Sequence, residues 1–168
     1  MRTDAFAVYL IQRLGSIKGK KAFQKLVYLA QVIGIPLDKS YRMHYYGPYS
    51  EQVADDMNEM VRDQIISHLG ANTYAEGRNS EEVINESADE INQYNQEFET
   101  LIDLFGDMSP RELEIYATAH FVDLSFNNLH GISDRDKIIE ETKKAKYPKF
   151  SMEEINSAYN QLEEWDLL

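Results

Sequence analysis

The side chains best suited to chemistry in this sequence are lysines near its start. Ser16–Gly19 leads into a predicted helix that carries a basic stripe of Lys18, Lys20, Lys21 and Lys25. Ammonium groups on one helix face can neutralise phosphates, so the stripe is the main nucleic-acid signal of the sequence. The alternatives are an ordinary solvated helix face, or a face that pairs with acidic groups.

Tyrosines give a second candidate surface. An alternation of period two over 41–46 predicts a short strand with Tyr41 and Tyr45 on its core side. Tyr46 and Tyr49 instead flank Gly47-Pro48 and can reach the surface. Exposed tyrosine is favoured at protein interfaces, so we predict Tyr46 and Tyr49 as partner-binding residues.

The helix predicted over about 51–63 offers an acidic face. That face carries Glu51, Asp55, Asp56, Glu59 and Asp63, with Arg62 as its one base. Carboxylates at the position of a groove-reading helix would repel DNA phosphates, which disfavours docking in the major groove. We therefore predict that Asp55 and Glu59 contact a protein.

Catalytic and metal-binding patterns are missing from the sequence. The four histidines, which are His44, His68, His120 and His130, fall in separate predicted elements without metal-ligand spacing. Phosphate-binding glycine loops and the G-x-S-x-G nucleophile motif are absent, as is cysteine. Asp55-Asp56 and Asp134-Arg135-Asp136 lack the spacing of a calcium loop. We expect a protein that is not an enzyme and uses no metal or cofactor.

A mainly α fold with a small β component must position these residues. The apolar periodicity predicts helices over about 4–14, 20–33, 51–63, 81–105, 110–126, 133–144 and from 151, with strands over 41–46, 65–69 and 73–76. Ser109–Glu112 and Ser151–Glu154 have the pattern of capping boxes. The order helix, helix, strand, helix, strand–turn–strand is typical of a winged helix. We predict a winged-helix-like unit over 1–78 and a helical subdomain over 79–168 packed on it as one globular domain.

Charge is distributed unevenly along the chain. The sequence has 17 Lys+Arg and 29 Asp+Glu, for a formal net charge of -12. Eight of the basic residues but only two acids, Asp4 and Asp38, lie in residues 1–50. An acidic protein is a poor general binder of nucleic acid. Neither an apolar run of about 18 residues nor a signal-peptide pattern is found, so we expect a cytoplasmic protein that does not interact with membranes.

Four segments together resemble a bacterial family. They are Lys25–Gln31 (KLVYLAQ), Tyr46–Ser50 (YGPYS), Ser109–Phe121 (SPRELEIYATAHF) and Lys146–Phe150 (KYPKF). Their order and spacing are similar to those of the YwgA-like proteins and, more distantly, of the Panacea or SocA-type antitoxin-associated domains. The resemblance implies a fold and, on the Panacea side, a small regulatory partner of a toxin or of the proteolysis machinery. Lys25, Tyr28, Gly47 and Pro48 fall on motif positions, but the resemblance assigns them no catalytic role.

The first hypothesis is therefore a non-enzymatic module for protein–protein interaction, antitoxin- or adaptor-like, with a toxin or regulatory protein as partner. Lys25 and Tyr28 are expected on the outer side of the second helix. The predicted partner-binding residues are Tyr46, Tyr49, Lys25, Tyr28, Asp55 and Glu59. The alternative is a DNA-binding winged-helix regulator, as a monomer or a homodimer, that uses the stripe from Lys18 to Lys25.

Overall fold

The computed structural model describes residues 1–130 and 134–168, with the side chains of residues 128–130 outside the described part. The described residues form eight α-helices and two short β-hairpins, which confirms the expected mainly α fold with a small β component. The elements in chain order are α1 (Thr3–Leu14), α2 (Gly19–Ile33), β1 (Arg42–His44), β2 (Gly47–Tyr49), α3 (Glu51–Arg62), β3 (Ile66–His68), β4 (Tyr74–Glu76), α4 (Ser80–Gln93), α5 (Asn95–Phe105), α6 (Pro110–His130), α7 (Arg135–Lys146) and α8 (Met152–Glu164).

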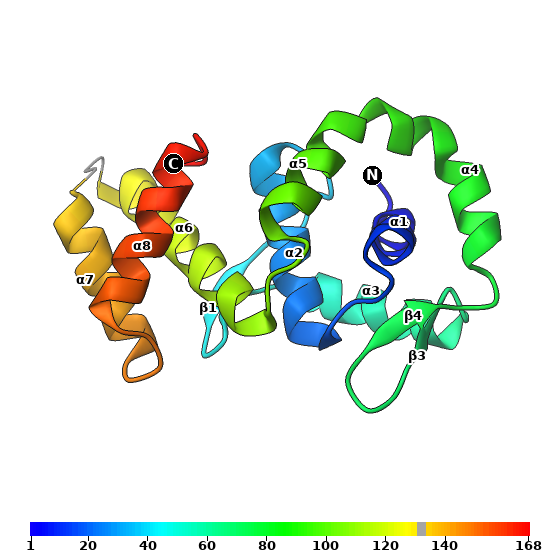
Figure 1. Ribbon diagram of the computed structural model, residues 1–168, viewed down its shortest axis with the longest axis horizontal. Coiled ribbons are helices and arrows are strands. Elements are labelled where there is room, and N and C mark those ends of the chain that lie inside the picture. Colours follow the sequence, from blue (N-terminus) through cyan, green and yellow to red (C-terminus); the bar gives the residue numbers. More distant parts are fainter. Residues whose placement is uncertain (131–133) are drawn as a thin grey trace.

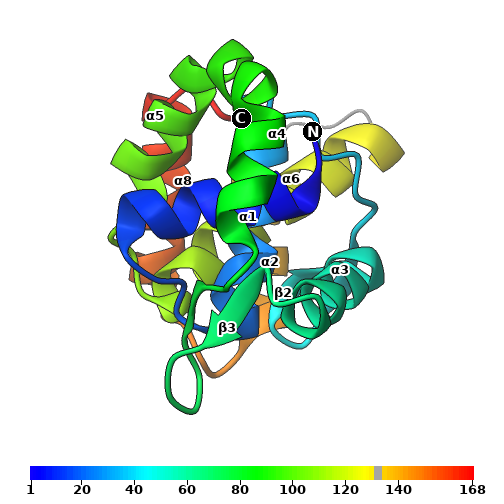
Figure 2. The same cartoon turned by 90° about the vertical axis from the view of Figure 1, so that its right-hand side faces the viewer.

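Helix α1 is enclosed by later parts of the chain. Helices α4 and α5 arch over it, and Figure 2 shows α4 crossing in front of α1, with β3 below and α3 to one side (Figures 1 and 2). Ala5 and Val8 pack against Val83 of α4, while the ring of Phe6 stacks on that of Phe98 in α5 at a centroid distance of 5.7 Å. One hydrophobic cluster thus contains residues from both parts of the chain, and the division after residue 78 stays a prediction.

The prediction of one continuous helix over 81–105 is wrong. The helix is interrupted at Tyr94, whose φ of -108° and ψ of 25° are not helical, so that α4 ends before it and α5 begins after it. The apolar spacing continues through the break, and for this reason the pattern did not reveal it. The bend allows α4 to pack on α1 while α5 packs on α2.

The prediction of a single strand over 41–46 is also wrong, because this segment forms a hairpin with the residues after it. Strand β1 pairs antiparallel with β2 in a register that sets His44 opposite Gly47, so Tyr45 and Tyr46 form the turn. Tyr45 is 76% exposed, contrary to the expected core position. Tyr41 is half-buried, and its ring lies 5.0 Å from that of Tyr28.

The second hairpin, β3–β4, has a third backbone partner. The N–H of Ile17, between α1 and α2, donates to the carbonyl oxygen of Tyr74 at 2.9 Å, and the N–H of Tyr74 donates back to Ile17 at 2.9 Å. This isolated bridge ties the α1–α2 connection to the hairpin that follows α3.

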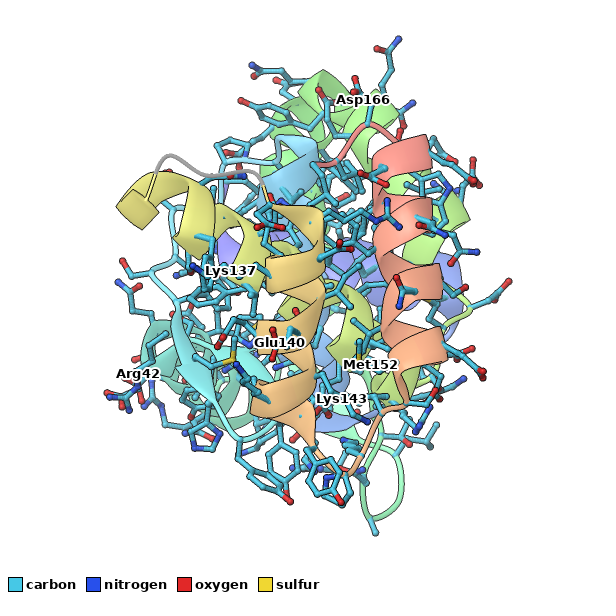
Figure 3. The ribbon with its side chains drawn as sticks, turned by 90° about the vertical axis from the view of Figure 1, so that its left-hand side faces the viewer. Arg42, Lys137, Glu140, Lys143, Met152 and Asp166 are labelled. Atoms are coloured by element: carbon cyan, nitrogen blue, oxygen red, sulfur yellow. The ribbon has the colours of Figure 1, made fainter. Side chains whose placement is uncertain are left out.

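Helices α6, α7 and α8 form the other side of the molecule. In Figure 3, α7 and α8 lie side by side in front, with Lys143 on the first and Met152 on the second. Helix α6 lies between this pair and α2, and it is buried continuously from Leu113 to His120. The capping box predicted at Ser151 is confirmed by both of its hydrogen bonds. The start predicted for α7 at Ser133 lies outside the described residues, and Asp134 serves as the N-cap.

Candidate functional site

Polar side chains of α2 hold the segment that contains β1 and β2. The side-chain amide of Gln24 donates to the carbonyl oxygen of Ser50 at 2.7 Å and accepts from the N–H of Ser50 at 2.9 Å. Gln31, two turns later on the same helix, makes the same pair of bonds with Lys39, at 3.1 and 2.7 Å. Each glutamine therefore pairs with both the N–H and the C=O of one residue, as a neighbouring strand would. Ser50 in turn caps α3, as predicted, by accepting from the N–H of Val53.

Lys25 is bound to the same segment from inside the protein. Its ammonium donates to the carbonyl oxygen of Pro48 at 2.7 Å, and the residue is only 2% exposed. The expectation that Lys25 and Tyr28 lie on the outer side of α2 is wrong, because α6 and the β1–β2 hairpin cover that side. The exposed basic stripe therefore consists of Lys18, Lys20 and Lys21.

Gly47 is required by the closeness of this packing. Its φ of +83° lies in the left-handed region that L side chains avoid. A Cβ atom built there would lie 2.6 Å from Oγ1 of Thr118 on α6 and 3.4 Å from Cε of Lys25. The glycine thus allows the hairpin backbone to rest directly on α2 and α6.

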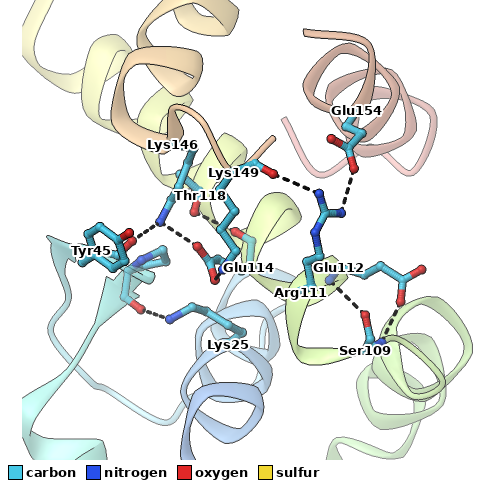
Figure 4. A network of polar contacts seen from close by, with 11 residues as sticks. Lys25, Tyr45, Ser109, Arg111, Glu112, Glu114, Thr118, Lys146, Lys149 and Glu154 are labelled. Carbon is cyan, nitrogen blue, oxygen red and sulfur yellow. Dashed lines mark hydrogen bonds and ion pairs between the residues drawn. The ribbon is translucent and has the colours of Figure 1, made fainter. Parts of the chain in front are cut away.

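A buried ion cluster lies beneath the hairpin (Figure 4). The carboxylate of Glu114 on α6 accepts from the ammonium of Lys146 at 2.9 Å and also forms an ion pair with Lys149. Lys146 donates a further bond to the carbonyl oxygen of Tyr45 at 2.7 Å. Two lysines from distant parts of the chain, Lys25 and Lys146, therefore hold two carbonyl groups of one hairpin.

Burial and the neighbouring charges together set the pKa values in this cluster. Burial lowers the pKa of Lys25 to about 8, against the opposing attraction of Glu114 and with help from Lys146 and Lys149. Burial also lowers the pKa of Lys146. Burial alone would raise the pKa of Glu114, but the hydrogen bonds from Lys149 and Lys146 outweigh it, so the pKa is lowered and the group stays ionised.

A pocket of about 320 Å³ opens between α2, α3 and the hairpin, and we call it the hairpin pocket. It is lined by Lys20, Lys21, Gln24, Lys25, His44, Tyr46, Tyr49, Ala54, Met57 and Asn58. Within the described residues, its lining contains three lysines and no aspartate or glutamate.

Tyr46 is fixed at the pocket by two cations. The ammonium of Lys21 lies 3.3 Å from the centre of its ring, and that of Lys149 lies 5.5 Å from it. Such contacts are favourable because the ring face is electron-rich. The ring of Tyr49 lies 5.3 Å from that of His44 on the neighbouring strand.

The structure thus brings five of the predicted site residues together. Tyr46, Tyr49, Lys20, Lys21 and Lys25 all line the hairpin pocket. Their predicted roles in binding stay predictions.

The other predicted site residues lie elsewhere. Lys18 is exposed just before α2, and Asp55 is exposed on the outer face of α3. Glu59 lines a separate pocket of about 300 Å³, where its neighbour Asp56 already pairs with Lys39 at 2.5 Å.

Tyr28 does not lie at the surface and instead belongs to a buried polar pair. Its hydroxyl lies 2.7 Å from Nδ1 of His120 on α6. Burial raises the pKa of Tyr28 and lowers that of His120, so both groups stay neutral and share one hydrogen bond between the hydroxyl and Nδ1. This arrangement explains Tyr28 as a contact between α2 and α6.

The sequence analysis missed Glu114, Lys146 and Lys149. Glu114 is a charged residue within a buried run of α6, and that is the signal that could have revealed it. Lys146 ends α7, where a lysine also suits the helix dipole, and the resemblance that includes Lys146–Phe150 assigned it no role.

Two further properties bear on the kind of site. Among residues 1–130 and 134–168, no group of three or more His, Asp or Glu side chains is placed to hold a metal ion, although the side chain of His130 lies outside the described part. None of the described helices combines the length and the apolar character needed to span a membrane.

Comparison with known proteins agrees with the YwgA-like part of the motif resemblance and does not show the relation to Panacea or SocA-type domains. No protein-family model matches the chain. The chain is 28% identical over 153 residues to the uncharacterized protein YwgA of Bacillus subtilis (strain 168). The match covers 89% of this chain and 88% of that protein. The similarity therefore extends over most of both chains and supports a YwgA-like family for this sequence.

Proposed function

We propose that this chain is a non-enzymatic binding module that receives an acidic segment of a protein partner at the hairpin pocket. The observation that carries the proposal is the lining itself, in which Lys20, Lys21 and Lys25 converge on one pocket that no described carboxylate lines. Complementary charge across an interface speeds association and selects the partner. The effect is local, because the chain as a whole is acidic, with a net charge of -12.

The tyrosines of the pocket supply the apolar part of such an interface. Tyrosine is enriched among the residues that dominate binding energy, since it combines a large apolar ring with a polar end. Tyr46 lies in the turn and Tyr49 is the last residue of β2, and both are partly exposed. Cation contacts with Lys21 and Lys149 keep the ring of Tyr46 in place before a partner arrives, so less conformational entropy is lost on binding.

The kind of protein that we propose as the partner rests on the motif resemblance alone. Panacea or SocA-type domains are associated with antitoxins, so a toxin or another regulatory protein is the partner that this resemblance favours. An acidic surface or tail on that protein is the feature that the pocket chemistry requires.

A DNA-binding winged helix is the second candidate. The Ile17–Tyr74 bridge adds a strand-like residue to β3–β4. The order α1, Ile17, α2, α3, β3, β4 then resembles that of a winged helix, with the β1–β2 hairpin as an insertion between α2 and α3. Lys18, Lys20 and Lys21 would then contact phosphates. We rank this candidate second because the outer face of α3, at the usual reading position, is acidic.

Fluorescence anisotropy with a labelled oligoglutamate peptide tests the proposal. We expect the wild-type chain to bind this peptide and not an oligoglutamine of equal length. The double variant Lys20→Glu/Lys21→Glu should bind about tenfold or more weakly, because both changes place like charge at the pocket. The matched control is Lys137→Glu/Lys144→Glu, which makes the same change in net charge at exposed positions of α7 and should leave binding unchanged.

The same variants separate the two candidates. Random duplex DNA at low salt should bind more weakly than oligoglutamate. If duplex DNA binds the wild type and is lost in Lys20→Glu/Lys21→Glu while oligoglutamate never binds, the nucleic-acid function replaces the proposed one. Equal loss of peptide binding in the α7 control would show that only net charge matters, and the pocket would then have no role.

A further inference from the structure

Lys25 has more hydrogen-bonding capacity than the described protein uses. An ammonium group can donate three hydrogen bonds. Among the described residues, Lys25 donates one, to the carbonyl oxygen of Pro48 at 2.7 Å. The residue is 2% exposed, so bulk water does not readily satisfy the remaining donors, and Lys25 belongs to the lining of the hairpin pocket.

The charge around Lys25 is also unbalanced. The carboxylate of Glu114 is the attractive charge acting on it, and this group is already bonded to Lys146 and Lys149. Lys21, Lys146 and Lys149 act on Lys25 with the same sign of charge. A buried charge without a direct ionic partner is costly, and a negative group brought into the pocket would offset that cost.

Lys146 differs from Lys25 in this respect. Its ammonium donates to both the carboxylate of Glu114 and the carbonyl oxygen of Tyr45, and Lys146 does not line the pocket. Lys25 is therefore the buried cation that a ligand in the hairpin pocket can reach.

We propose that the hairpin pocket binds one carboxylate of the acidic segment on the ammonium of Lys25, and that this bond couples binding to the protonation of Lys25. The inference rests on the proposed function and assigns its central contact. Lys20 and Lys21, both exposed at the rim, attract the segment, whereas Lys25 binds one of its carboxylates.

The coupling follows from the state of Lys25 in the free protein. Its pKa of about 8 means that about half of the molecules carry a neutral amine near pH 8. A carboxylate at hydrogen-bond distance favours the charged form and raises this pKa, so binding near pH 8 takes up protons. The titratable groups around Lys25 are Glu114 of α6, Lys146 and Lys149 at and after the end of α7, Lys20 and Lys21 of α2, and His44, Tyr46 and Tyr49 of the hairpin. Helix α3 contributes Ala54, Met57 and Asn58, which do not titrate.

Isothermal titration calorimetry with the oligoglutamate peptide measures the coupling. Titrations near pH 8 in buffers of different ionisation enthalpy give the number of protons taken up per peptide bound. For the wild type we expect uptake approaching about half a proton, with affinity falling as the pH rises through about 8. Lys25→Gln should abolish the uptake and weaken binding by about tenfold to a hundredfold, as expected for a lost hydrogen bond to a charged group.

A control variant separates Lys25 from the rim. Lys20→Gln also removes one positive charge from the pocket but leaves Lys25 in place, so it should weaken binding and retain the proton uptake. Thermal unfolding of each variant checks that it is folded. The proton uptake of the wild type is a test that does not depend on the folding of any variant.

The outcomes also separate this inference from the function on which it rests. If oligoglutamate fails to bind the wild type, the proposed function fails. If it binds without proton uptake, and with the same affinity in folded Lys25→Gln, the function stands and the role of Lys25 is refuted. Equal uptake in Lys25→Gln would refute it as well, since another group would then be titrating.

Discussion

Replacing Glu114 by glutamine tests the buried ion cluster directly. The substitution keeps the shape of the side chain but removes the carboxylate that pairs with Lys146, whose side chain is 1% exposed. Breaking a buried pair by removing one partner costs about 3–5 kcal/mol, because the other charge is left uncompensated. The pair with Lys149 adds little, since that lysine is 35% exposed. Because the glutamine oxygen can still accept a hydrogen bond, we expect the free energy of unfolding to fall by about 3 kcal/mol at pH 7.

Urea unfolding followed by the fluorescence of Trp165 provides the assay. The matched control is Glu163→Gln, which breaks the exposed ion pair with Arg135 and should cost less than about 1 kcal/mol. The pKa of Glu114 is lowered on folding, so its contribution is complete above the unfolded value of 4.5 and is lost as the pH falls through the folded pKa. The difference in free energy of unfolding between Glu114→Gln and the wild type should therefore become smaller at acidic pH. A difference below about 1 kcal/mol at pH 7 would refute the cluster as a source of stability.

Three further predictions concern the hairpin and α2. Gly47→Ala should lower the melting temperature more than Gly15→Ala, because both glycines have positive φ but only the first meets a side chain, at 2.6 Å. Gln24→Leu leaves the buried N–H of Ser50 unpaired, whereas the carbonyl oxygen of Ser50 still accepts from the N–H of Ala54. The substitution should cost about 2 kcal/mol in urea unfolding and speed amide exchange at Ser50; unchanged exchange would contradict this. The pKa of Lys25 is lowered on folding from 10.5 to about 8, so the unfolded chain binds more protons between these values and stability rises with pH there. As the pH rises across this range, the free energy of unfolding of the wild type should increase by on the order of 3 kcal/mol relative to that of Lys25→Met. If the two free energies instead change in parallel with pH, Lys25 is not buried in its charged form.

The parts of the fold that the sequence predicted are those that local chemistry determines. The caps at Ser50 and Ser151 and the helix end at Gly15 each depend on a few neighbouring residues, and the structure contains all three. The boundaries of α2 and α3 followed from apolar periodicity within one residue. Such signals are sufficient because capping and amphipathicity act within a single element.

The parts that the sequence could not predict depend on contacts between distant segments. Lys25 appeared to lie on a solvated face because helical periodicity does not reveal that α6 and the hairpin cover it. Tyr45 alternated with polar neighbours as a core residue would, yet the turn of a hairpin exposes it. The pocket itself was indicated in part, since Tyr46 and the lysines were singled out. Their convergence required the turn geometry that Gly47 permits and that Lys25 and Lys146 hold through the carbonyl oxygens of Pro48 and Tyr45.

The bond between Lys146 and the carbonyl oxygen of Tyr45 spans 101 positions of the chain. During translation at about 5–20 residues per second, roughly 5–20 s separate the synthesis of these two residues. A ribosome-bound chain therefore carries the lysines and tyrosines of the pocket well before it carries the α7 residue that fixes the hairpin turn. The hairpin pocket is consequently one of the last regions to mature, and incomplete chains present its residues without its final shape.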